Sequence, residues 1–238
     1  GSQLRAGFGY RRPGLTLPTH DLSCSCLQPQ KIAVMPLFFV RLCFLTLLSM
    51  FSLGAGSGEH PLIADIHLHW KWNQKEVVSA AEAVQILKEQ NVGLAVVTGT
   101  PPELALELQE LAPEIVRPIY GIYRIPGEWS SWHHDQDLLA RVRRALDSGR
   151  YAGIGEVHMI GGFISDWKNP VITGLFGLAA EFDVPVLLHT EFSRANYTLG
   201  LCRAHPRTRI LWAHAGSMLK PSEIERVLDG CPNVQAEF

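Results

Sequence analysis

The chain has 238 residues, of which 47% are hydrophobic and 18% are charged. These proportions are typical of a globular protein and exclude a chain that is disordered throughout. The formal net charge is only -2, so there is no basic excess to neutralise a phosphate backbone, and nucleic acid is disfavoured as a partner.

The N-terminal part of the chain has the pattern of an export signal. Residues 1–34 are polar, contain Pro and Gly, and show no periodicity, so we interpret them as an unstructured leader that need not be native coding, with translation starting at Met35. Residues 35–56 combine Arg41 with an apolar run and end in small residues. This pattern predicts a secretory signal peptide and hence an exported, periplasmic or extracellular protein. An uncleaved membrane anchor is the alternative.

From Pro61 onward, apolar β-branched runs alternate with helical patterns. The apolar runs predict strands at residues 62–67, 93–98, 115–124, 153–158, 184–189, 209–214 and 233–238. The helical patterns span residues 74–90, 102–111, 136–146, 171–182, 193–204 and 221–228. Pro102 and Pro221 fall in expected first turns, and Gly149 and Gly230 follow helix ends. Strand and helix units that repeat in this way imply a parallel sheet.

The order of these elements predicts an α/β fold, namely a (β/α)8 TIM-type barrel over residues 61–238 with seven strands present and the eighth missing. A doubly wound open sheet is the main alternative. The sequence does not carry the Gly-rich phosphate loop that usually follows the first strand of such a sheet. Two cysteines, Cys202 and Cys231, fall within the predicted barrel. We interpret them as buried thiols, although they could pair in an oxidising compartment.

Side chains that can bind a metal fall at the ends of four predicted strands. They are His67 and His69 on the first strand, Glu156 and His158 on the fourth, His189 on the fifth and His214 on the sixth. In a barrel, these strand ends converge at one mouth, and alternate strand residues share a face. Each residue alone is more often an ordinary hydrogen-bonded side chain. Together, imidazole and carboxylate groups predict a divalent metal site, with one position left to water for hydrolysis.

At these positions the chain resembles the amidohydrolase superfamily of metal-dependent hydrolases, most closely its amidohydrolase-2-type members, over nearly all of residues 61–238. That family has His-x-His on strand one, Lys or Glu on strand four, one His each on strands five and six, and Asp on strand eight. The resemblance implies that His67 and His69 bind the more buried metal, that Glu156 bridges two metals, and that His189 and His214 bind the second. With a single metal, His67, His69 and His189 would bind it, and His214 would hold the water or substrate.

The sequence departs from the family pattern in two respects, both of which concern acidic residues. The strand-eight aspartate, which in the family binds metal and takes a proton from the attacking water, has no counterpart in the sequence, so the activity of the chain as given is in question. Glutamate on strand four is closer to TatD-type deoxyribonucleases and to phosphotriesterase relatives than to mononuclear decarboxylases, and the number of metals stays open. We interpret Glu191 and Glu237 as residues that support the ligands or fill the barrel.

Four residues are predicted to contact the substrate. Arg124 ends the third strand and could hold a carboxylate or phosphate, with an ordinary ion pair at the rim as the alternative. His158 lies one pleat beyond Glu156 and is an extra ligand, a substrate contact, or an outer hydrogen-bond partner. Trp129 and Trp132 belong to the loop at residues 125–137 and either line a pocket or pack within the loop.

The predicted function is metal-dependent hydrolysis, in which metal-activated water attacks an amide, a lactone or another ester of a small-molecule substrate. The expected cofactor is one or two divalent ions, with zinc as the expected metal. A metal-dependent decarboxylase (a lyase) of the amidohydrolase-2 type is the first alternative, for which Arg124 would suit an acid. A non-catalytic metal- or ligand-binding barrel is the second, and nuclease activity is disfavoured by the charge. A homo-oligomer is compatible with the sequence, and membrane contact is expected only if the signal is uncleaved.

Overall fold

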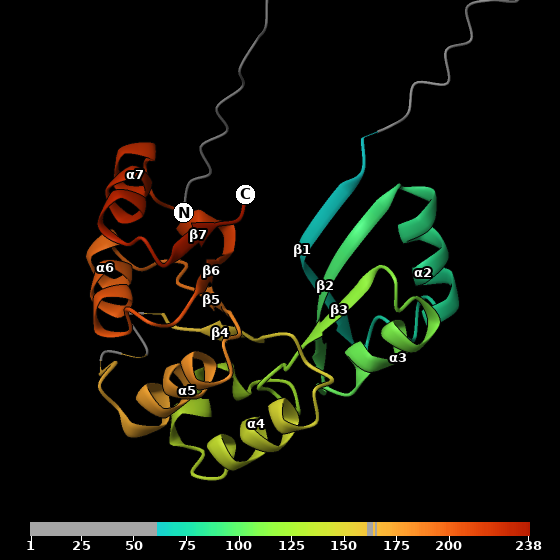
Figure 1. The fold of residues 1–238 in the computed structure, drawn as a ribbon, viewed down its shortest axis with the longest axis horizontal. Helices are drawn as coiled ribbons and strands as arrows, with labels where there is room; N and C mark the ends of the chain where they lie inside the picture. The colour runs from blue at the N-terminus through green and yellow to red at the C-terminus, as the bar shows by residue number, and fades with distance from the viewer. Residues whose placement is uncertain (1–60, 161–163, 165) are drawn as a thin grey trace, which may run out of the picture. The chain divides into compact units, whose positions relative to one another are not determined.

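The computed structural model of the protein describes residues 61–160, 164 and 166–238 (Figure 1). The predicted leader and signal peptide lie outside the described residues, so the export and localisation they imply stay predictions. Within the described part of the chain, no helix combines the length and the apolar run that a membrane span requires.

Parallel strands alternate with helices in the predicted order (Figure 1). The strands are β1 (Ile63–Lys71), β2 (Val92–Thr100), β3 (Val116–Ile119), β4 (Ile154–His158), β5 (Val186–His189), β6 (Ile210–Trp212) and β7 (Val234–Ala236). The α-helices are α2 (Ala80–Glu89), α3 (Leu104–Leu111), α4 (Leu138–Asp147), α5 (Pro170–Glu181), α6 (Ala195–Ala204) and α7 (Pro221–Gly230). Short 3₁₀ turns are η1 (Glu128–Ser130), η2 (Trp132–His134) and η3 (Ala213–Gly216).

The strands pair in sequence order, as the wall of a barrel requires. Within the described residues they form two parallel sheets, β1-β2-β3 and β4-β5-β6-β7. A parallel bridge between Tyr120 and Ile154 links β3 to β4. The paired strands within this part of the chain do not close the ring, because no pairing joins β7 to β1. The predicted α/β barrel-type fold is therefore confirmed, as an unclosed barrel of seven strands.

The structure departs most from the predicted boundaries at the start of α2 and at the end of β3. The helix expected from residue 74 begins at Ala80, because Ser79 caps it: the Ser79 hydroxyl accepts from the Glu82 amide, and the Glu82 carboxylate accepts from the Ser79 amide. The strand expected to reach residue 124 ends at Ile119, because only Tyr120 continues the pairing, through its bridge to β4. The residues that follow Tyr120 are therefore free to form a loop above the strand ends.

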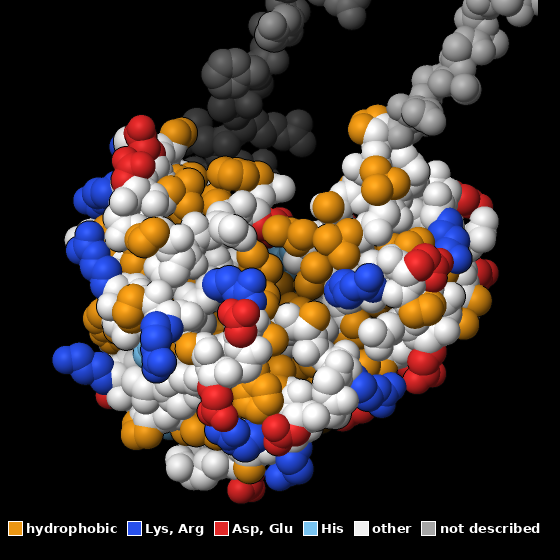
Figure 2. Space-filling view, in the orientation of Figure 1, with side chains coloured by type: hydrophobic (Ala, Val, Ile, Leu, Met, Phe, Trp, Pro, Cys, Tyr) orange, Lys and Arg blue, Asp and Glu red, His pale blue; other side chains and the backbone are white. Residues whose placement is uncertain are grey.

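Each sheet packs its helices around a separate apolar cluster. The larger cluster joins β4–β7 to α4–α7 and includes Phe176, Leu188 and Trp212. The smaller cluster joins β1–β3 to α2 and α3 and includes Val97 and Leu108. Burial of such apolar surface is the main favourable term in folding. The polar side chains scatter outside these clusters, and in Figure 2 Lys and Arg are interspersed with Asp and Glu, as expected for a small net charge.

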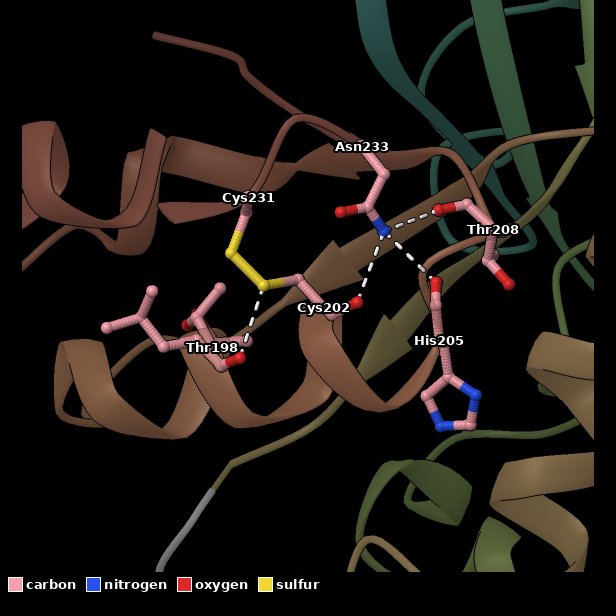
Figure 3. The surroundings of a disulfide bond; sticks show 8 residues. Thr198, Cys202, His205, Thr208, Cys231 and Asn233 are labelled. Carbon is pink, nitrogen blue, oxygen red and sulfur yellow. Dashed lines mark hydrogen bonds between the residues drawn. A yellow bond between two sulfur atoms is a disulfide. The ribbon is translucent and has the colours of Figure 1, made fainter. Parts of the chain in front are cut away.

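A disulfide joins α6 to the end of α7. Cys202 and Cys231 are both 1% exposed, with 6.0 Å between their Cα atoms. Beside the bond, the Asn233 side-chain amide donates to the carbonyls of His205 and Thr208 at 3.0 and 2.9 Å (Figure 3). Our expectation of simple buried thiols was wrong, because the fold brings the two residues to a distance that suits a disulfide.

Candidate metal centre

Five histidines and one glutamate meet at the C-terminal ends of four strands. The set is His67 and His69 from β1, Glu156 and His158 from β4, His189 from β5, and His214 from η3, directly after β6. The pleat of β1 turns His67 and His69 to one face, while Leu68 packs against the smaller apolar cluster. All the predicted ligands are therefore brought together, although His67 and His214 are 147 residues apart in the sequence.

Glu156 lies at the middle of this set and is 5% exposed. Its nearest neighbours are His189, with Nδ1 at 2.7 Å from Oε1, and His69, with Nε2 at 3.2 Å from Oε2. The Nε2 atoms of His67, His214 and His158 follow at 3.4, 3.7 and 3.8 Å. A buried carboxylate is costly unless it is compensated, so this carboxylate depends on the ring of imidazoles around it.

Local backbone geometry sets the direction of Glu156. The preceding Gly155 has φ 136°, a conformation that L side chains rarely adopt. A Cβ at this position would lie 2.6 Å from the Leu187 carbonyl oxygen of the neighbouring strand. The buried Thr98 hydroxyl of β2 donates to the Gly155 carbonyl. Residues of β5 and β2 thus surround the peptide from which the Glu156 side chain projects.

The imidazoles keep the Glu156 side chain ionised. Burial alone would raise the pKa of this carboxyl, but hydrogen bonds from His189, His67 and His69 outweigh burial and hold the pKa far below its usual range. For His67, burial lowers the pKa, yet the carboxylates of Glu156 and Glu237 raise it above the ordinary value. Burial lowers the pKa of His158 to about 4, so this imidazole is neutral at pH 7.

Two outer carboxylates contact the histidines from behind. Glu237 Oε2 lies 3.1 Å from His67 Nδ1 and accepts from the His214 amide at 2.9 Å. Glu191 Oε2 lies 3.3 Å from His189 Nε2. A carboxylate that accepts from one ring nitrogen leaves the lone pair of the other nitrogen free to bind a metal. Both residues therefore lie where a carboxylate can support a ligand histidine.

The arrangement of these donors fits a divalent cation. His67 Nε2 and His69 Nε2 face each other at 3.0 Å, so one ring must donate to the other unless a cation lies between them. Two ligands of one tetrahedral zinc ion, each bound at roughly 2.0–2.1 Å, lie about 3.3 Å apart. Two groups of three residues could each hold a metal ion. In each group, one ligand atom per residue lies within 4.8 Å of the other two; the groups are His67, Glu156 and His214, and Glu156, His158 and His189. Imidazole and carboxylate donors of this kind suit several first-row metals.

The predicted substrate contacts separate into two pairs. Trp129 and His158 line a cavity of about 240 Å³ beside the histidines. Arg124 instead forms ion pairs with Glu128 and Asp135 at 2.9 and 3.6 Å, which is the rim ion pair that we left as the alternative. Trp132 is 3% exposed and packs in the larger cluster.

In that position the Trp132 indole donates to the His158 carbonyl at 3.1 Å, so Trp132 supports the strand end from the core. Among the other residues that line the cavity are Lys71, Trp72 and Tyr123. The sequence reasoning did not select Lys71 or Tyr123. Lys71 could have been found, because it continues the alternation of His67 and His69 along β1 and therefore shares their face.

Comparison with known proteins gives a likeness of fold. No family model and no curated protein matches the sequence. Among solved structures, one described as a probable 2-pyrone-4,6-dicarboxylic acid hydrolase from Acinetobacter baumannii, with citric acid bound, matches at a TM-score of 0.51 and 13% identity, over 74% of this chain and 69% of that chain. A protein from Staphylococcus aureus, provisionally assigned as an amidohydrolase, matches at a TM-score of 0.47 and 13% identity, over 72% and 73% of the two chains. The match to the first of these structures supports the fold that the resemblance implied.

Proposed function

We propose that the protein is a metal-dependent hydrolase that cleaves an amide, a lactone or another ester of a small molecule. The observation that carries the proposal is the buried Glu156 carboxylate with ring nitrogens of five histidines within 3.8 Å of its oxygens. A cluster that only stabilised the fold would be expected to have fewer ring nitrogens converging on one carboxylate. These donors lie at the strand ends of a barrel-type fold, which is where such folds usually carry their active sites.

His67, His69, Glu156, His189 and His214 are the proposed ligands of one or two divalent ions, with zinc as the first candidate. When bound, a divalent ion lowers the pKa of coordinated water toward neutrality and polarises the bond to be cleaved. Glu156 supplies the negative charge that offsets the cation. It touches His67 and His69 from one sheet and His189 from the other, so both sheets hold the same centre.

His214 has the most suitable position to contact the reacting groups. Its side chain is 42% exposed, against 4% for His67 and 11% for His189, while its Nε2 remains 3.7 Å from Glu156 Oε1. With a single ion bound by the more buried histidines, the His214 imidazole can accept or return a proton at Nε2 or hold a substrate oxygen. The backbone amide of His214 donates to Glu237, which fixes this position.

The proposal is tested by metal analysis and turnover on the same preparation. The full chain is expected to bind one or two divalent ions per molecule, and to hydrolyse at least one member of a panel of lactones, esters and amides. A chelator should abolish hydrolysis, and restoring the ion should recover it. Release of carbon dioxide without net addition of water would instead identify a decarboxylase. Stoichiometric metal without any turnover would favour the non-catalytic barrel and contradict the proposal.

A matched pair of variants controls for general effects of charge. Glu156→Gln removes the central carboxylate and should remove both metal and activity. Glu181→Gln removes an exposed carboxylate of α5. Glu181 pairs with Arg143 at 2.6 Å and is not among the residues that contact the metal centre. Such surface pairs contribute little to stability, so this variant should keep wild-type metal content and turnover.

A further inference from the structure

Lys71 is the last residue of β1 and lines the cavity beside the candidate metal centre. It follows His67 and His69 in the alternation of the strand, so all three side chains leave the same face. The rise of a strand puts the Lys71 Cα on the order of 7 Å beyond that of His69. Lys71 and the histidines are therefore close enough for one small molecule to contact both.

Lys71 differs from other basic residues nearby in having no carboxylate partner among the described residues. Lys75, four residues on, pairs with Glu107 at 2.8 Å. Arg124 pairs with Glu128, the carboxylate that also lines the cavity, at 2.9 Å. The negative charge of Glu128 is thus already offset from outside the cavity. The Lys71 ammonium remains as the uncompensated charge of the cavity lining.

Several aromatic side chains contribute to the remaining walls of the cavity. Trp72 and Trp129 are each 39% exposed and contribute their rings, and the Tyr123 ring lies beside them in the lining. The ring of His158 completes the side toward the metal centre, 6.4 Å from the Trp129 ring. Aromatic walls of this kind favour flat apolar groups. The volume of about 240 Å³ lies below the range of about 300–1,000 Å³ that is usual for drug-sized ligands.

We propose that Lys71 binds a carboxylate of the substrate, so that the protein acts on a small, flat acid whose ester, lactone or amide bond lies at the histidines. This inference rests on the proposed function for the bond that is cleaved. Lys71 takes the role in recognising an acid that the sequence suggested for Arg124, because the Arg124 guanidinium is occupied by Glu128 and Asp135. Lys71 acts as a specificity-determining residue and takes no part in the cleavage itself.

Binding of benzoate and of its neutral counterpart benzamide tests the inference without turnover. Calorimetric titrations use the protein as purified and again after a chelator, because a carboxylate held only by a metal would be lost with the metal. Benzoate should bind more tightly than benzamide in both states. Lys71→Met should weaken benzoate binding about tenfold or more, as expected for a hydrogen bond to a charged group, and leave benzamide binding unchanged.

Two further variants keep the result interpretable. Lys71→Arg retains the positive charge and should keep part of the preference for benzoate, which separates loss of charge from a fault in folding. Lys75→Met removes a neighbouring lysine that pairs outside the cavity and should behave as the wild type. Equal binding of benzoate and benzamide by the wild type would overturn the inference. Wild-type affinity for benzoate in Lys71→Met would also overturn it.

Turnover separates this inference from the proposed function. If hydrolysis is found, Lys71→Met should raise the KM for a carboxylate-bearing ester about tenfold and leave kcat/KM for its neutral amide-capped counterpart unchanged. If the panel shows no hydrolysis while Lys71→Met still loses benzoate, the proposed reaction fails and the carboxylate site stands. If hydrolysis is found with equal KM in wild type and variant, the carboxylate site fails and the reaction stands.

Discussion

The sheet of β4 to β7 holds the central carboxylate of the candidate metal centre, whereas the sheet of β1 to β3 and the loops that follow it build most of the cavity beside it. Glu156 and His189 are 5% and 8% exposed and stand on strands that pack against the larger apolar cluster. The cavity is lined instead by residues that end β1 and β2 or follow β3, such as Lys71, Thr100 and Tyr123. His158 of β4 belongs to both.

The metal centre and the substrate cavity place different requirements on the structure around them. A buried carboxylate needs a surrounding that cannot relax, because uncompensated charge in the interior is costly. A substrate cavity needs exposed side chains on loops, which can vary without disturbing a core. Changes in β4 to β7 should therefore affect metal and stability, and changes around the cavity should affect selectivity.

The largest expected effect comes from Glu156→Gln. The neutral amide cannot offset a cation and loses the charge that attracts His189, His67 and His69, so bound metal should fall close to zero and hydrolysis below detection. Elemental analysis of the purified variant measures the first result. His69→Gln, on the other sheet and with a side chain 27% exposed, should lose less metal. Equal metal in Glu156→Gln and wild type would show that the centre does not depend on β4.

Removal of the disulfide should have the next largest effect. Cys202 and Cys231 close a loop with a sequence separation of 29, for which the chain-entropy model gives roughly 3–4 kcal/mol of stabilisation. The double variant Cys202→Ala with Cys231→Ala should lower the free energy of unfolding by about that amount in denaturant titrations. Reducing the wild type provides the control for the lost sulfur atoms.

Hydrogen exchange would locate the effect of that loss within the molecule. Amides of α6 and α7, which the bond joins, should exchange faster, while those of β2 should change least. If β2 lost protection to the same degree as α6, the two sheets would unfold as one unit, and the distinction drawn between them would not extend to stability.

The positions of the metal-centre residues follow from the sequence because two simple rules act together. Side chains alternate along a strand, which pairs His67 with His69, and parallel strands end at one edge, which adds Glu156 and His189. His214 was expected on a strand but lies just beyond it, in η3 with φ 55°. His214 nevertheless lies beside Glu156, because η3 follows directly after the end of β6. Which of these residues bind metal remains a prediction.

Other features depended on contacts that no local pattern encodes. Arg124 and Lys71 are both basic residues near strand ends, yet only the fold shows that Arg124 is paired and that Lys71 is not. Trp129 and Trp132 belong to one loop, yet only Trp132 is buried in the larger apolar cluster, while Trp129 stays partly exposed. The helix start at Ser79 was different, because its Ser-x-x-Glu capping box was readable in the sequence and was overlooked.

Gly155→Ala tests whether the backbone before Glu156 is under local constraint. The strained φ and the Cβ placed 2.6 Å from the Leu187 carbonyl should together cost about 3 kcal/mol of unfolding free energy, measured by denaturant titration. Gly177→Ala is the matched control, because that glycine lies within α5 with open space at its Cβ position. It should stabilise the protein by about 0.5–1 kcal/mol. Equal effects of the two substitutions would contradict the constraint.

A smaller effect, and one that concerns the contact between the two sheets, is expected for Glu237→Gln. Glu237 follows β7 and lies 3.1 Å from His67 Nδ1 of β1, so it fixes the ring orientation of a ligand on the opposite sheet. A neutral amide can still accept a hydrogen bond but withdraws the charge. Metal affinity, measured by competition with a chelating dye, should fall about 10- to 100-fold while the fold persists.

Glu191→Gln provides the comparison within the β4 to β7 sheet, because Glu191 contacts His189 at 3.3 Å from a more exposed position, 30% against 17% for Glu237. Solvent screens such a charge more strongly, so its loss should reduce metal affinity less than loss of Glu237. A larger effect from Glu191 would mean that His189 depends more on its outer carboxylate than His67 does. The contact of Glu191 within the β4 to β7 sheet would then support the centre more than the contact of Glu237 across to β1.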